Sequence, residues 1–96
     1  MVINVLLKSM SEVVNGVSNS TGNAYQSQDI LVEWSEPMSD GRERISRLMV
    51  RLHTAEVDRL AAMNPVPGQT TLSLDLLFST RSYNGRVYND VTARLA

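Results

Sequence analysis

Arginine and tyrosine side chains gather in the segment RSYNGRVYND, residues 81–90, and these residue types are the best suited to chemistry in the sequence. A guanidinium binds phosphate oxygens and stacks on planar groups, and a tyrosine ring offers a face on which a nucleobase can stack. The same pattern would arise if these side chains were ordinary cross-strand pairs on a solvated sheet face. The segment therefore predicts either a binding surface or a plain hairpin, and both alternatives stay open. Four such side chains flank the central Asn84-Gly85: Arg81, Tyr83, Arg86 and Tyr88.

Further residues of the same types lie elsewhere in the chain. Arg47 and Arg51 alternate with apolar residues in RLMVRL, Tyr25 ends a polar loop, and Arg94 stands near the end of the sequence. We expect the arginines to face phosphates and the tyrosines to stack on bases, as in proteins that bind single strands. The candidate nucleic-acid-binding residues are thus Tyr25, Arg47, Arg51, Arg81, Tyr83, Arg86, Tyr88 and Arg94.

The composition argues against metal, disulfide and catalytic sites. The chain has no cysteine and a single histidine, His53, so disulfides and cysteine-based zinc sites are excluded, and we expect no metal and no cofactor. Carboxylates such as Asp29 and Glu33 fit exposed strand positions better than acid–base catalysis, so no enzymatic activity is expected. The formal net charge of −1 predicts weak to moderate nucleic-acid binding, although eight of the nine cationic side chains are arginine.

The elements that position these residues follow from periodicity and turn signals. Ninety-six residues suit one domain, spanning 1–96. The sequence predicts strands at 2–8, which could continue to Val14, at 26–34, around Leu48–Leu52, at 72–78 and beyond Gly85 to residue 95, with a loop at 15–25. One helix is predicted over 54–63, with Thr54 as its N-cap. Trp34 and Phe78 share the parity of the apolar positions and are expected in the core.

This order of elements predicts an all-β fold. A five-stranded Greek-key barrel of the OB type has one short helix between its third and fourth strands, which matches the predicted order. In such a barrel the loop near residue 20, the hairpin at 84 and the strand that carries Arg51 converge on one cleft. Another small barrel and an open α+β sheet remain as alternatives.

Three segments also resemble a known family: GVSNSTGNAYQSQDILVE (16–33), RLMVRLHTAEVDRL (47–60) and LSLDLLFSTRSYNGRVYNDVTARL (72–95). They are similar to small, poorly characterised bacterial OB-fold proteins related to single-stranded-DNA-binding proteins, whose final hairpin has the form Arg-x-Tyr-Asn-Gly-Arg. The resemblance implies an OB barrel and non-catalytic binding of single-stranded nucleic acid across its second and third strands. The chain departs from the family at Val87 and Arg94-Leu95, where relatives tend to carry tryptophan.

The expected partner is single-stranded DNA, with RNA as an alternative. A second hypothesis is a protein-interaction or assembly module of the same fold, with a subunit contact formed by Ile45, Met49 and Leu77. A homo-oligomer, dimer or tetramer, is expected by analogy with the fold. The chain has no apolar run long enough to span a membrane and no basic leader ahead of its first apolar stretch, which favours a cytoplasmic location.

Overall fold

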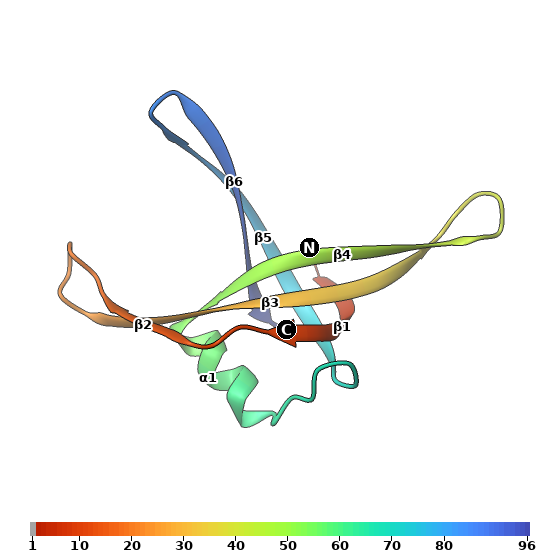
Figure 1. Cartoon of the computed structure of the whole chain (residues 1–96), viewed down its shortest axis with the longest axis horizontal. Helices are drawn as coiled ribbons and strands as arrows, with labels where there is room; N and C mark the ends of the chain where they lie inside the picture. The colour runs from red at the N-terminus through yellow and green to blue at the C-terminus, as the bar shows by residue number, and fades with distance from the viewer. Residues whose placement is uncertain (1) are drawn as a thin grey trace.

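A computed structural model describes residues 2–96 and contains six strands and one helix (Figure 1). Long strands dominate it, and a single helix directly follows the fourth strand. The elements are β1 (Val2–Met10), β2 (Val14–Val17), β3 (Ala24–Pro37), β4 (Glu43–His53), α1 (Thr54–Ala62), β5 (Thr71–Tyr83) and β6 (Arg86–Leu95).

Five of the strands close into a barrel. β1 pairs antiparallel with both β3 and β5, β3 pairs with β4, and β5 pairs with β6. The circle closes between β4 and β6, which run parallel, with Arg51 opposite Thr92. This connectivity is the OB-like all-β barrel that the sequence predicts, and α1 lies between its third and fourth barrel strands. The open α+β sheet considered as an alternative is wrong.

The alternation of apolar residues along the strands builds the core. In the barrel portions of β3 (30–34), β4 (48–52) and β5 (72–76), even-numbered residues point inward, because side chains on a strand alternate between its two faces. The core residues are Val5, Leu7, Ile30, Val32, Val50, Leu52, Val57, Leu60, Leu72, Leu74, Leu76, Ala93 and Leu95. Trp34 is partly buried against this core, with its indole N–H donating to Glu36.

Helix α1 contributes Val57 and Leu60 to the core and packs on β3, β4 and β6. The N-cap is His53 rather than the predicted Thr54, and its side chain makes no capping hydrogen bond. The hydroxyl of Thr54 instead accepts a hydrogen bond from the backbone N–H of Gln26, which ties the start of the helix to β3. Asn64 adopts a positive φ of 50° just beyond the helix, which ends the element ahead of Pro65.

Three hairpins project beyond the barrel, and they correct two sequence predictions. Residues 14–17 form β2, which pairs with β3 at the edge of the sheet, so the segment predicted as a loop over 15–25 is in part a hairpin. The β5–β6 hairpin continues far past the last residue that pairs with β1, and Phe78 on it is 62% exposed rather than buried. These hairpins extend the molecule: its radius of gyration is 15.3 Å, whereas about 12.5 Å is typical of a compact domain of this length.

Candidate nucleic-acid interface

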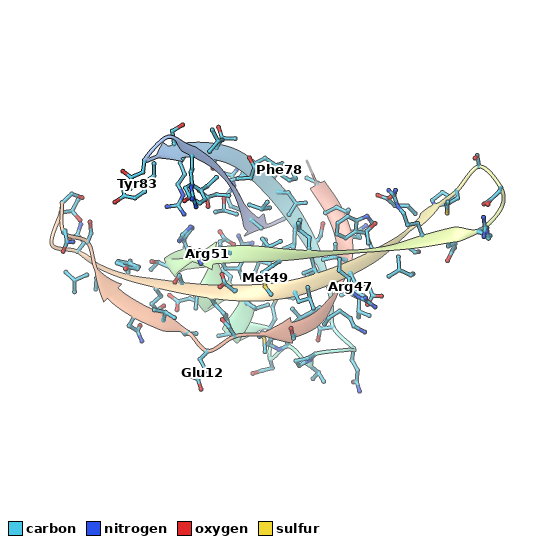
Figure 2. All side chains as sticks on the ribbon, turned by 45° about the horizontal axis from the view of Figure 1, so that its top comes forward. Glu12, Arg47, Met49, Arg51, Phe78 and Tyr83 are labelled. Atoms are coloured by element: carbon cyan, nitrogen blue, oxygen red, sulfur yellow. The ribbon has the colours of Figure 1, made fainter. Side chains whose placement is uncertain are left out.

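The outer face of β4 and the projecting β5–β6 hairpin, residues 78–91, form the two sides of an open hollow of about 430 Å³. Figure 2 shows Arg47, Met49 and Arg51 spaced along β4, and Tyr83 near the tip of the hairpin above them. In both figures the β2–β3 and β5–β6 turns lie on the same side of the barrel, while the β3–β4 turn points the opposite way. The hollow is lined by Asp29, Met49, Arg51, His53, Ser79, Arg81, Asn89, Asp90, Val91 and Thr92.

Arg51 enters the hollow from β4 because odd-numbered residues of this strand face outward. Directly opposite on β3 lies Asp29, whose Oδ1 is 3.0 Å from Arg51 Nε. This hydrogen bond, with the charge of Asp29 and a smaller contribution from Asp90, raises the pKa of Arg51 above its ordinary value. Asp90 comes from β6 and lines the same hollow as Arg51, so the two walls face a common space.

Arg81 enters the same hollow from β5. Its Nε is 3.1 Å from Asp90 Oδ2 on the neighbouring strand, and its guanidinium carbon lies 5.5 Å from the centre of the Tyr88 ring. Arg81 and Tyr88 are directly opposite in the β5–β6 register, and Asp90 is the diagonal neighbour. The structure therefore joins a cation, a carboxylate and an aromatic ring on one face of the hairpin.

The tip of the β5–β6 hairpin carries the last cross-strand pair, Tyr83 opposite Arg86. Asn84 and Gly85 form the two-residue turn, and both have positive φ, as a type I′ turn requires. Tyr83 is 68% exposed. Within residues 2–96, Arg86 forms no ion pair, so its charge is available to a ligand.

Of the eight predicted site residues, only Arg51 and Arg81 line the hollow. Tyr83, Arg86 and Tyr88 lie on the hairpin beside it, and the other three lie elsewhere. The Tyr25 ring packs over Gly16 of β2, where an added Cβ would lie 2.5 Å from the ring Cζ. Arg47 pairs with Glu33 at 3.6 Å, and Glu33 also pairs with Lys8. Arg94 pairs with Asp75 at 3.2 Å, eight cross-strand positions from the Tyr83–Arg86 pair at the hairpin tip. Tyr25, Arg47 and Arg94 are therefore separate from the group formed by Arg51, Arg81 and Tyr88.

Sequence reasoning missed the carboxylates of the hollow. The alternation of residues places Asp29 at an exposed strand position and indicates no role for Asp90. The Asn84-Gly85 turn fixes the register of its hairpin, so the neighbourhood of Arg81, Tyr88 and Asp90 follows from the sequence once a two-residue loop is assumed. The pairing of Asp29 with Arg51 could not be read in this way, because the β3–β4 turn is longer and does not fix a register.

The arrangement offers hydrogen-bond donors, acceptors and aromatic faces. Across residues 2–96 no three histidine or acidic side chains are grouped so as to hold a metal ion. Nor does any helix in the same range have the length and apolar character needed to cross a membrane. No family model matches the chain, and no curated protein matches its sequence.

Proposed function

We propose that the protein binds single-stranded nucleic acid, DNA before RNA, in the hollow between β4 and the β5–β6 hairpin, without catalysis. One observation carries the proposal. In an OB-like barrel, the hollow beside the second and third barrel strands holds Arg51 and Arg81, and the latter lies over the Tyr88 ring. This is the surface through which OB folds bind oligonucleotides. Bases would stack on Tyr83 and on the guanidinium of Arg81, and Arg86 would contact the phosphate backbone.

The test is a fluorescence anisotropy titration with a labelled single strand of mixed sequence, about 15 nucleotides long to cover the site sizes of OB folds. We expect saturable binding at low salt. Tyr83→Ala should weaken it about fivefold or more, since a stacked base contributes at least about 1 kcal/mol. Because Tyr83 is exposed, this substitution should leave the thermal unfolding midpoint unchanged. Absence of saturable binding by the wild-type protein at low salt would refute the proposal.

A second candidate function is self-assembly through exposed apolar side chains. Ile45 and Met49 lie on the outer face of β4, and Leu77 lies on the outer face of β5; all three are exposed. A second copy of the chain covering them would give a dimer or tetramer. Light scattering checks this: Ile45→Asp should lower the measured mass to that of a monomer, whereas Arg86→Ala should not. A wild-type monomer at all concentrations would exclude this candidate.

A further inference from the structure

The carboxylates of the hollow call for an explanation beyond phosphate binding. Asp29 and Asp90 are each about 40% exposed and lie beside Arg51 and Arg81, so the hollow holds as many carboxylates as guanidinium groups. A carboxylate repels a phosphate and cancels much of the attraction of the neighbouring arginine. A groove that only follows a sugar–phosphate backbone gains nothing from these two acids.

Carboxylates can instead accept hydrogen bonds from the N–H groups of unpaired bases. Proteins read single strands mostly on base edges that no complementary strand occupies. Guanine has two neighbouring donors, N1–H and the N2 amino group, next to the acceptors O6 and N7. Thymine has one donor, N3–H, between two carbonyl oxygens that repel a carboxylate. An arginine beside an aspartate is therefore complementary to guanine and poorly matched to thymine.

Asp90 and Arg81 have the geometry for this recognition. They are diagonal neighbours on β6 and β5, with Asp90 Oδ2 3.1 Å from Arg81 Nε, and Arg81 lies over the Tyr88 ring. A base that meets this pair edge-on, in the plane of the guanidinium, has its edge within reach of both the Arg81 donors and the acid beside them. Asp29 is less suited, because Arg51 Nε already donates a hydrogen bond to its Oδ1, whereas Arg81 and Asp90 are joined by an ion pair alone.

We propose that the hollow prefers guanine among unpaired bases, with Asp90 accepting from N1–H and the N2 amino group and Arg81 donating to O6 or N7. This specificity rests on the nucleic-acid binding proposed above and adds the base that the site selects. Asp90 acts as a specificity determinant, while stacking on the hairpin supplies sequence-independent affinity.

Three labelled single strands test the proposal: repeated TTG, the same strand with inosine in place of each guanine, and oligothymidine, each about 15 nucleotides long. Lithium buffer prevents guanine quadruplexes. The wild-type protein should bind the TTG strand at least about fivefold more tightly than oligothymidine, the lower end of the discrimination given by a bidentate contact. Inosine, which lacks the N2 amino group, should lose most of that preference.

Asp90→Asn should remove the preference and, since it deletes a negative charge, tighten the binding of oligothymidine. The matched control is Asp40→Asn in the β3–β4 turn, where the carboxylate pairs with Arg42 and not with a residue of the hollow. It makes the same change of charge and should keep the guanine preference. Equal wild-type affinity for TTG and oligothymidine would overturn the inference and leave the proposed function standing. Failure of all three strands to bind would remove both.

Discussion

The ion pairs of the hollow predict an unusually shallow salt dependence for single-strand binding. Arg51 and Arg81 are each compensated by an acid in the same hollow, which leaves Arg86 at the hairpin tip as the cation that neutralises a phosphate. For single strands, the logarithm of the affinity falls with the logarithm of the salt concentration with a slope of about −0.7 per neutralised phosphate. Raising salt from about 50 to about 200 mM should therefore weaken wild-type binding only about 2.6-fold.

The double variant Asp29→Asn, Asp90→Asn should change this slope. It releases two guanidinium groups, so about three phosphates would be neutralised and the slope would approach about −2.1, an affinity loss of roughly 18-fold over the same salt range. Anisotropy titrations with oligothymidine at four or more salt concentrations within that range give the slope directly. This probe contains no guanine, so base recognition does not enter. The Asp40→Asn variant should keep the wild-type slope.

Two results would refute the reasoning. A wild-type slope near −2 would mean that the carboxylates do not compensate the arginines when a strand is bound. An unchanged slope in the double variant would mean that neither Arg51 nor Arg81 contacts phosphate once released.

Three further predictions concern the fold. Leu74→Ala should lower the free energy of unfolding, measured in urea, by about 2–5 kcal/mol because the side chain is fully buried. Phe78→Ala, on the same face of β5, should lower it by less than about 1 kcal/mol because the ring is exposed. Equal losses would contradict the structure. The Glu36 pKa is lowered from its ordinary value of 4.5 because Trp34 and Arg44 donate hydrogen bonds to the carboxylate. These contacts are complete above pH 4.5 and are lost as the pH falls through the lowered pKa of Glu36. The fluorescence emission of the single tryptophan should therefore change with a midpoint below pH 4.5. Glu36→Gln should abolish the change. Gly16→Ala should push the Tyr25 ring off β2, because the new methyl would lie 2.5 Å from its Cζ; unchanged ring signals of Tyr25 in NMR spectra would disagree.

Local patterns in the sequence determine much of the barrel. Strict alternation in 48–52 and 72–76 predicts strands with one buried face, and the structure buries Leu52, Leu72 and Leu74 there. The short periodic segment before Asn64-Pro65 predicts a single helix, and the structure has one at Thr54–Ala62. These features depend on neighbouring residues along the chain, so a pattern of side chains is enough to reveal them.

Alternation fails where the strands leave the barrel. Phe78 and Val87 lie at positions of the same parity as the buried residues of β5 and β6, yet both are exposed. The pairing of β5 with β1 ends at Asp75, before this part of the hairpin. Parity specifies which face a side chain occupies, and only the packing of distant segments decides whether that face is covered. Residues 14–17 show the converse case, in which a segment mostly predicted as loop pairs with β3.

In the candidate site too, some features can be predicted from the sequence and others depend on the tertiary structure. The sequence by itself determines the turn of the final hairpin and which of its arginines and tyrosines lie opposite each other, because a two-residue Asn-Gly loop fixes the register. Only the tertiary structure decides which charges they meet. Asp29 is 22 residues from Arg51 in the chain but lies directly opposite it on the neighbouring strand. Barrel closure brings Asp90 of β6 to the same hollow as this pair. Charge–charge interaction depends on distance in space, and for these residues that distance is set by strand register and barrel closure rather than by separation along the chain.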